Sequence, residues 1–289
     1  MTDERMQLWA PAKINLSFRI LGRRPDAFHE IDTLMAPISL RDRLTFAYEK
    51  GAPTVHFRCD DLSLPSGPEN LVVRAAELFL RATGARARLT IELEKQIPHG
   101  AGLGGGSSDA AATLLGLNQI LETDLDETTL FELAAQLGAD VPFFISRSAA
   151  VCRGRGDIVR RATLPRVFDL LLVKPAFAVA TPEAYALWKD SRELPDVEYS
   201  GQQFGSVSFV NDLERPVFEK YVFLSEIKQW LRRQPEVAAA LLSGSGSTVF
   251  GVVNDAADAN KLADRARAEL DPTLWTCVAS TIADFAPAP

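Results

Sequence analysis

The chain has 289 residues, enough for one or two domains with a sizeable buried core. Its 47% hydrophobic and 24% charged residues are typical of a globular protein, and no apolar run reaches the roughly 18 residues of a membrane-spanning helix. A net charge of −7 disfavours nucleic acid as a partner. These features predict a globular protein that binds neither nucleic acid nor membrane.

Cysteine usage indicates the compartment. Cys59, Cys152 and Cys277 are scattered and odd in number, which argues against a disulfide framework or a thiolate metal site. The polar N-terminal stretch MTDERMQLW lacks the apolar segment of a signal peptide. We therefore expect a cytoplasmic protein, and its oligomeric state stays open.

Apolar periodicity and turn residues predict the elements in chain order. Strands are expected across residues 13 to 60, with breaks at Pro37 and at Ala52-Pro53. Because strands and helices mix without a regular βαβ repeat, we predict the α+β class. The other predictions are helices over 70–83, 110–121, 127–137, within 217–231 and over 256–269; strands over 87–94, 167–173, 248–253 and 276–283; a solvated loop holding the arginines of 153–161; a loop or flexible lid over 189–210; and a disordered tail at 286–289.

The first predicted strand carries two polar side chains on one face. From Lys13 the residues alternate, with Ile14 and Leu16 apolar and Lys13 and Asn15 polar. This period of two is that of a half-buried strand, so Lys13 and Asn15 share its polar face. Taken alone, such a pair indicates only a solvated sheet face.

The stretch PHGAGLGGGSSDAAA, residues 98–112, is the most informative in the chain. Gly102, Gly104, Gly105 and Gly106 lack a Cβ, so this backbone can approach a bulky ligand closely. The helix predicted to follow presents free N–H groups and the positive end of its dipole. A glycine-rich loop between a strand and a helix is a phosphate cradle, and a flexible glycine turn is the alternative.

The loop is neither of the two commonest phosphate loops. The pattern GxxxxGK[ST] is absent, which argues against a Walker-type site. Gly102 and Gly104 open a GxGxxG pattern only if Ser107 is ignored, and no acidic residue about 20 positions later ends a following strand, as a dinucleotide fold requires.

A third segment completes a set of motifs. LSGSGSTVF, residues 242–250, is a second glycine-rich turn that leads into a predicted strand. With PAKINL at 11–16 and the glycine loop, it resembles in order the three motifs of the GHMP kinases, over most of the chain. The resemblance implies phosphoryl transfer from ATP to a small alcohol. It also implies an N-terminal domain like domain 2 of ribosomal protein S5 and a ferredoxin-like C-terminal domain, expected at 1–160 and 161–289, with the active site between them.

Two segments resemble one branch of this family, whose alcohol substrate carries a cytidine diphosphate. They are GRRPDAFHEIDTLM at 22–35 and LGADVPFF at 137–144. Ala27 and Phe28 depart from that branch, which has glycine and tyrosine there, although Phe28 keeps an aromatic face. The resemblance implies phosphorylation of the 2-hydroxyl of this cytidylyl substrate, in the non-mevalonate route to isoprenoid precursors.

Two residues are the catalytic candidates. Asp140 follows the helix predicted over 127–137, which Gly138 ends as a C-cap, and taken alone it is an ordinary turn aspartate. The resemblance implies that Asp140 accepts the proton of the attacking hydroxyl, and that Lys13 lies beside it. An ammonium there keeps the carboxylate ionised and offsets the charge that develops on the phosphoryl oxygens.

The same resemblance implies the substrate-binding residues. Phe28 and Tyr185 are expected as the walls of a slot for cytosine, where stacking is worth roughly 1–3 kcal/mol per base. His29, which alone is an ordinary surface or structural histidine, is expected to read the pyrimidine edge. Asn15 and Thr181 are expected at the alcohol and diphosphate end.

ATP and Mg²⁺ are the expected cofactors. Mg²⁺ keeps several waters and takes few protein ligands, so Ser107 or Ser108 is offered as a hydroxyl ligand and no carboxylate identifies itself. The residues expected to bind the nucleotide are Pro98, Gly100, Gly102, Leu103, Gly104, Gly105, Gly106, Ser107 and Ser108 at the phosphates, and Asn70 and Lys95 near the adenine.

Two other functions stay open. Another small-alcohol kinase of the family, of the homoserine or mevalonate type, would share the glycine loop, but it has no need of Phe28 and His29 together with Tyr185. A nucleotide-binding regulator that has lost catalysis is the second alternative, and the presence of both Lys13 and Asp140 argues against it.

Overall fold

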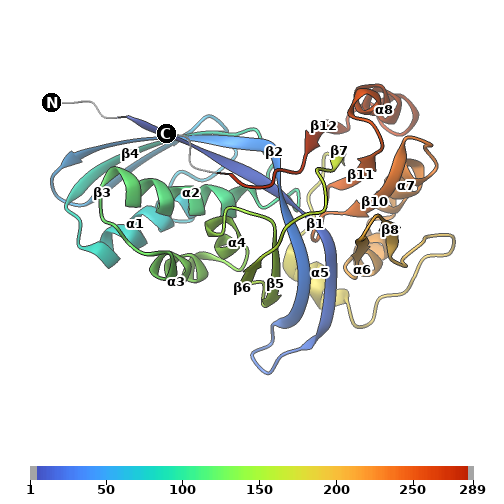
Figure 1. Cartoon of the computed structure of the whole chain (residues 1–289), viewed down its shortest axis with the longest axis horizontal. Helices are drawn as coiled ribbons and strands as arrows, with labels where there is room; N and C mark the ends of the chain where they lie inside the picture. The colour runs from blue at the N-terminus through green and yellow to red at the C-terminus, as the bar shows by residue number, and fades with distance from the viewer. Residues whose placement is uncertain (1–4, 286–289) are drawn as a thin grey trace.

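A computed structural model describes residues 5–285. The first four residues and the tail at 286–289, predicted to be disordered, lie outside the described residues. A long antiparallel hairpin of β1 (Met6–Arg23) and β2 (His29–Lys50) runs through both halves of the molecule (Figure 1). Within 5–285, no helix is long and apolar enough to cross a membrane.

An eight-stranded sheet organises the first half. Its order is β3-β4-β2-β1-β9-β8, and β5 and β6 extend it from β2. Four helices cover one face of this sheet (Figure 1). The bounds are β3 (Thr54–Cys59), β4 (Ala87–Glu94), β5 (Ala150–Gly154), β6 (Ile158–Arg161), β8 (Gln202–Phe204), β9 (Val207–Asn211), α1 (Leu71–Thr83), α2 (Gly105–Ile120), α3 (Glu127–Leu137) and α4 (Val141–Ile145).

Local capping explains where two of these helices begin. The side chain of Asn70 accepts a hydrogen bond from the N–H of Val72 at 2.9 Å, and that of Asp126 accepts from Thr129 at 2.8 Å. Such caps satisfy N–H groups that have no partner inside the helix. The strand predicted over 87–94 and the helix over 127–137 are confirmed to the residue.

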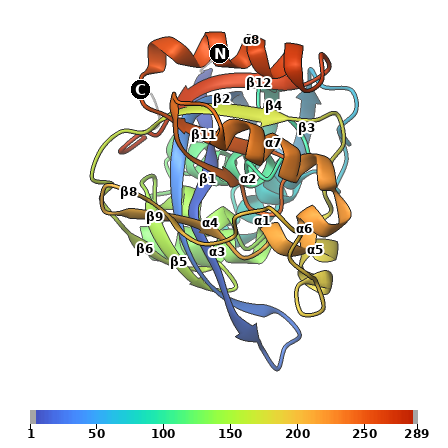
Figure 2. The same ribbon diagram turned by 90° about the vertical axis from the view of Figure 1, so that its right-hand side faces the viewer.

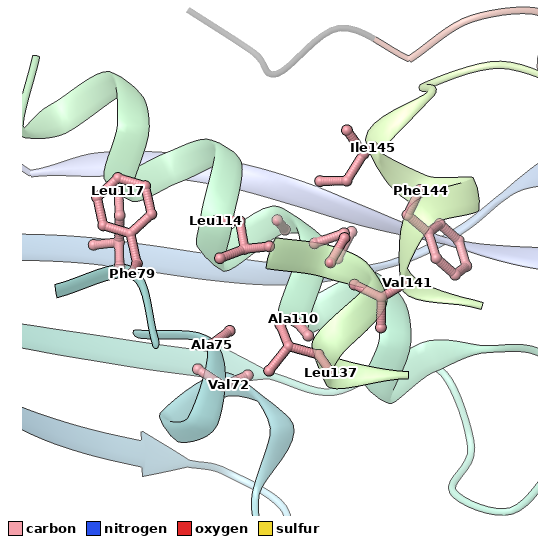
Figure 3. Close-up of a cluster of buried hydrophobic side chains, with 14 of the residues drawn as sticks. Val72, Ala75, Phe79, Ala110, Leu114, Leu117, Leu137, Val141, Phe144 and Ile145 are labelled. Atoms are coloured by element: carbon pink, nitrogen blue, oxygen red, sulfur yellow. The ribbon is translucent and has the colours of Figure 1, made fainter. Parts of the chain in front are cut away.

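The helices close over the sheet through one apolar cluster (Figure 3). Phe79 of α1, Leu114 of α2 and Phe144 of α4 are almost fully buried. Burial of side chains of this size stabilises the fold by about 1.5–3 kcal/mol each. Small residues such as Ala75 and Ala110 fill the space between α1 and α2, so the start of α2 is held rigidly against the sheet.

The second half contains a four-stranded antiparallel sheet with the order β10-β11-β7-β12. Helices α7 and α8 lie over it (Figure 2), and its other face packs on the long hairpin, where Ile14 and Ala36 join Leu172 and Phe250 in a shared cluster. The bounds are β7 (Asp169–Lys174), β10 (Val237–Leu242), β11 (Val249–Val253), β12 (Trp275–Ser280), α5 (Thr181–Leu187), α6 (Glu214–Lys220), α7 (Val222–Arg232) and α8 (Ala256–Glu269).

This mixture of strands and helices confirms the predicted α+β class. The strands β8 and β9 follow residue 160 in the chain, yet they join the sheet of the first half, with Ser17 opposite Val210 in a parallel pair. The division of the chain at residue 160 therefore stays a prediction.

Three predictions about individual segments were wrong. Pro37 does not break its strand, because the β1–β2 ladder shifts register between Pro11 and Lys13, where a missing N–H is tolerated. The end of the segment 189–210 forms the β8–β9 hairpin. Among the arginines of 153–161, expected in a loop, Arg153, Arg160 and Arg161 lie on the strands of the β5–β6 hairpin, and only Arg155 lies in its turn. Strand β10 was not predicted.

Candidate active site

A cleft of about 1070 Å³ lies between the two halves of the molecule. Residues of the β1–β2 hairpin, the glycine loop, the segment 139–140, α5 and the turn 244–245 line it. The structure therefore brings the three motifs of the sequence, at 11–16, 98–112 and 242–250, together with the aromatic residues around one cleft.

The glycine loop leads directly into α2. Gly100, Gly102 and Gly104 have φ of +62°, +73° and +71°, in the left-handed region where a side chain is strained. Gly104 is the N-cap of α2 and offers no side-chain cap, so the first N–H groups of the helix are left for a ligand. The helix begins at Gly105, earlier than predicted, and this makes Gly105, Gly106 and Ser107 its first turn.

The two glycine-rich turns interlock. A Cβ on Gly102 would lie 2.2 Å from the carbonyl oxygen of Ser243, closer than real Cβ contacts occur. The hydroxyl of Ser243 donates to the carbonyl of Gly102 at 3.0 Å, and the N–H of Thr248 donates to that of Ala101 at 3.1 Å. The loop of the first half and the turn of the second half therefore form one unit.

Lys13 lies at the centre of the cleft. Its backbone N–H donates to the carbonyl of Leu103 at 2.9 Å, which ties β1 to the glycine loop. Its Nζ donates to Asn15 Oδ1 at 2.7 Å and lies 3.6 Å from Asp140 Oδ2. The Lys13 side chain is 5% exposed and that of Asp140 is 38% exposed, so the cation is held inside while the carboxylate faces the cleft.

Short bonds also fix the neighbours of Lys13. Asn15 Nδ2 donates to Thr33 Oγ1 at 2.8 Å, and Thr33 in turn donates to the carbonyl of Ser17. Asp140 is placed by the turn between α3 and α4 and makes no cap bond of its own. Its oxygens are therefore available to a substrate. The structure brings Lys13, Asn15 and Asp140 together, and their catalytic and binding roles stay a prediction.

Aromatic side chains line the other end of the cleft. The ring of His29 stacks on Tyr185, with centroids 5.0 Å apart and planes inclined by 27°, and Trp188 meets His29 edge-on at 5.7 Å. Phe28 is 54% exposed, and the guanidinium of Arg155 lies 5.0 Å from its ring centroid. Burial, with the charge of Arg23 adding to it, lowers the pKa of His29, which favours a neutral imidazole.

Two residues of this end escaped sequence analysis. Trp188, the C-cap of α5, follows Tyr185 by three positions, and this helical spacing puts both rings on the same side. Arg155 lies in the turn between β5 and β6 and lines the cleft. Thr181, at the start of α5, shares a 2.8 Å hydrogen bond with Ser245 and so joins α5 to the second glycine turn.

The residues predicted near the adenine have structural partners. Asn70 caps α1, and its Nδ2 donates to the carbonyl of Pro65. Lys95 forms ion pairs with the buried carboxylates of Asp42 and Asp109, the second at 2.9 Å. Burial raises the pKa of Asp109, and Lys95 opposes this rise. Both Asn70 and Lys95 line the cleft, and their role at the base stays a prediction.

The donors available to a metal ion are few. Among residues 5–285, no group of three or more histidine, cysteine, aspartate or glutamate side chains could hold one. Ser107 and Asp140 line the cleft, while Ser108 is buried with an unpartnered hydroxyl. Asp109 also lines the cleft, with an unpartnered Oδ1. A hydroxyl and carboxylates beside a phosphate cradle fit Mg²⁺, which binds with the phosphates and keeps its waters.

Comparison with known proteins identifies the family. The model of the GHMP kinases N terminal domain matches residues 70–148, and that of the GHMP kinases C terminal domain matches 174–271. The chain belongs to the GHMP kinases. Its glycine loop and the Asp140 segment lie within the first match, and the second glycine turn lies within the second.

Similar GHMP kinases narrow the comparison. The 4-diphosphocytidyl-2-C-methyl-D-erythritol kinase of Methylacidiphilum infernorum is 42% identical over 278 residues, which cover 95% of this chain and 96% of that protein. That of Syntrophotalea carbinolica is 42% identical over 88% of this chain and 92% of its own.

Solved structures of GHMP kinases share the fold of this chain. A crystal structure of 4-(cytidine 5'-diphospho)-2C-methyl-D-erythritol kinase has a TM-score of 0.77 at 37% identity, covering 95% of this chain and 99% of its own. A homoserine kinase from Cytophaga hutchinsonii has a TM-score of 0.70 at 18% identity, over 98% of this chain and 96% of its own, and shares the fold.

Proposed function

We propose that this GHMP kinase transfers the γ-phosphoryl group of ATP to the 2-hydroxyl of 4-diphosphocytidyl-2-C-methyl-D-erythritol, in the non-mevalonate route to isoprenoid precursors. The observation that carries the proposal is one cleft with a phosphate cradle at one end, an aromatic pocket at the other, and the Lys13–Asp140 pair between them. Relatives about 40% identical over most of the chain carry the name of this enzyme.

The lysine and the aspartate divide the chemistry. Asp140 accepts the proton of the attacking hydroxyl, because its carboxylate faces the cleft and makes no cap bond. Lys13, fixed by Asn15 and by the carbonyl of Leu103, stabilises the charge on the transferred phosphoryl group. Phosphoryl transfer depends mainly on such positioning and electrostatic stabilisation.

The aromatic end selects the cytidine. Phe28 presents an exposed face for stacking, and the neutral imidazole of His29 has one donor and one acceptor for a pyrimidine edge. Tyr185, which stacks on His29, is the second wall of the cytosine slot. Asn15 and Thr181 lie toward the alcohol and diphosphate end, where Thr181 already contacts Ser245 of the second glycine turn.

The nucleotide occupies the glycine loop. The phosphates bind the N–H groups at the start of α2, from Gly104 to Ser107, with Pro98, Gly100, Gly102 and Leu103 shaping the cradle and Ser108 behind it. Asn70 and Lys95 lie on the base side. Ser107 would contribute a hydroxyl ligand to Mg²⁺, which would neutralise the charge of the phosphates. The three free cysteines fit a cytoplasmic enzyme.

The deciding experiment is release of ADP from ATP and Mg²⁺ with three alcohols in parallel: 4-diphosphocytidyl-2-C-methyl-D-erythritol, homoserine and mevalonate. We expect turnover with the first alone, and none when Mg²⁺ is replaced by a chelator. Turnover with homoserine or mevalonate only would contradict the cytidine pocket. ATP binding without turnover on any alcohol would support a regulator.

A further inference from the structure

Residues 211–214, from the end of β9 to the start of α6, connect the two sides of the cleft, and of these four only Leu213 lines it. Asn211 and Glu214 are 3% and 1% exposed, and neither was singled out by sequence analysis. The side chains of Asn211 and Glu214 both bind the end of β10 at Leu242, and that of Asp212 binds β1. We define these four residues, 211–214, as the brace.

Asn211 binds the second glycine turn. Its Nδ2 donates to the carbonyl of Leu242 and to that of Gly244, both at 2.8 Å, while its Oδ1 accepts from the N–H of Leu213. Both N–H groups of one amide are therefore used to hold two carbonyls two residues apart. This arrangement sets the direction in which the chain leaves β10 and enters the turn.

The backbone that Asn211 holds lies against Lys13. Gly244 has φ of +56°, and a Cβ built on it would lie 3.2 Å from Lys13 Nζ and 3.4 Å from Asn15 Oδ1. Gly244 also lines the cleft. A displacement of the turn by a few tenths of an ångström would therefore change the space around the Lys13 ammonium.

The other polar residues of the brace bind β1 and the end of β10. Asp212 accepts hydrogen bonds from the N–H of Ile20 and from Arg19, at 2.8 and 2.9 Å, on the strand that carries Lys13. Glu214 accepts from the N–H of Leu242 at 2.9 Å and pairs with the buried Lys228 at 2.6 Å. The brace thus connects β1 to the end of β10.

We propose that Asn211 is a positioning residue for phosphoryl transfer, which holds the Gly244 turn in register with Lys13. The proposal rests on the kinase function proposed above. Its physical basis is that a buried carbonyl deprived of its donor moves to find another, and small displacements near reacting groups reduce the rate strongly.

The chain offers a matched control in Gln202, which is 7% exposed. Its Nε2 donates to the carbonyl of Ala240 at 2.8 Å and its Oε1 accepts from the N–H of the same residue, so a second buried amide holds β10 further from the turn. Gln202→Glu and Asn211→Asp each remove an amide donor that binds a carbonyl of β10. Gln202→Glu leaves the hydrogen bond to the glycine turn in place.

The test is steady-state kinetics of wild type, Asn211→Asp, Asn211→Ser and Gln202→Glu, with thermal unfolding measured in parallel. We expect Asn211→Asp to lower kcat about 100-fold and to leave KM for the cytidylyl alcohol within about threefold, because the aromatic pocket belongs to other elements. Gln202→Glu, whose new carboxylate lies beside the guanidinium of Arg232, should retain kcat within about threefold.

Asn211→Ser keeps the proposal testable if the buried charge prevents folding, because it removes the amide without adding a charge. A kcat within threefold of wild type in this variant would overturn the proposal, and so would an equal loss of kcat in Gln202→Glu. A wild-type protein without turnover would contradict the kinase function instead. In that case, calorimetric binding of a non-hydrolysable ATP analogue tests the positioning role of Asn211. Weaker binding by Asn211→Ser than by Gln202→Glu would support this role, and equal binding would overturn it.

Discussion

Lys13 Nζ lies 3.6 Å from Asp140 Oδ2, although the two residues belong to different elements of the first half. The ammonium is also bound to Asn15 and is almost buried, whereas the carboxylate is open to the cleft. This asymmetry assigns different roles to the two charges, because a fixed cation can stabilise a phosphoryl group while an accessible carboxylate can take a proton.

Asp140→Asn tests the proton acceptor. The amide keeps the shape of the side chain and removes its charge, so we expect kcat to fall about 100-fold or more with little change in Tm. Asp126→Asn is the matched control, because asparagine caps a helix as well as aspartate does. Near-wild-type turnover in Asp140→Asn would remove Asp140 from the mechanism.

Ala27 is a strained residue in the turn before Phe28. Its φ of +68° lies in the left-handed region, where glycine is tolerated and alanine is not favoured. Ala27→Gly should therefore raise the free energy of unfolding, by up to about 1 kcal/mol. The exposed helical position Ala135 provides the opposite case, since Ala135→Gly should lower it by about 0.5–1 kcal/mol. Urea unfolding of both variants checks the two signs.

Gly102→Ala should separate the two interlocked turns. The added Cβ would meet the carbonyl of Ser243 at 2.2 Å, in addition to the strain of a positive φ. We expect a loss of at least about 2 kcal/mol of stability together with loss of turnover. Gly84 has a similar φ of +70° with nothing within 4 Å of its added Cβ, so Gly84→Ala should cost only about 1 kcal/mol. Equal losses in the two variants would show that contact with Ser243 is unimportant.

The pKa of His29 lies below its ordinary value of 6.5, because of burial and then the charge of Arg23. Between the two pKa values the unfolded chain binds more protons than the folded protein, so stability falls as the pH drops below about 6.5. The kcat/KM for the cytidylyl substrate should decline only at lower pH, as the pH falls through the lowered pKa of His29 in the folded protein. Arg23→Gln should raise the pKa of His29 in an NMR titration, and Arg19→Gln should leave it unchanged.

Lys95→Met should leave two carboxylates buried without a cation. Breaking a buried pair in this way costs about 3–5 kcal/mol. Burial already raises the pKa of Asp109, and loss of Lys95 raises it further, so protonation at lower pH relieves the variant. Because the pKa of Asp109 is already about 8 in the wild type, the difference in unfolding free energy between wild type and Lys95→Met should shrink as the pH falls from 10 to 8. A constant difference would contradict the account.

Much of the fold follows from signals that are local in the chain. Asn70 and Asp126 cap the helices that follow them. The conformation of the glycine loop can also be predicted locally, because glycine itself permits the positive φ found at Gly100, Gly102 and Gly104. The alternation from Lys13 to Leu16 likewise decides which side chains share a face. These features depend on residues within a few positions of one another.

The remaining features depend on residues brought together by folding. The β8–β9 hairpin is too short to show a period, and it becomes a strand pair by adding to β1. The Asp42–Lys95–Asp109 group joins a strand, a loop and a helix that no spacing relates. Sequence alone therefore determined the longer helices and the glycine loop between β4 and α2, but not the short helices α4 and α5. Tertiary structure decided which of them meet, because hydrogen bonds such as those of Asn211 form only once distant backbone segments have been packed together.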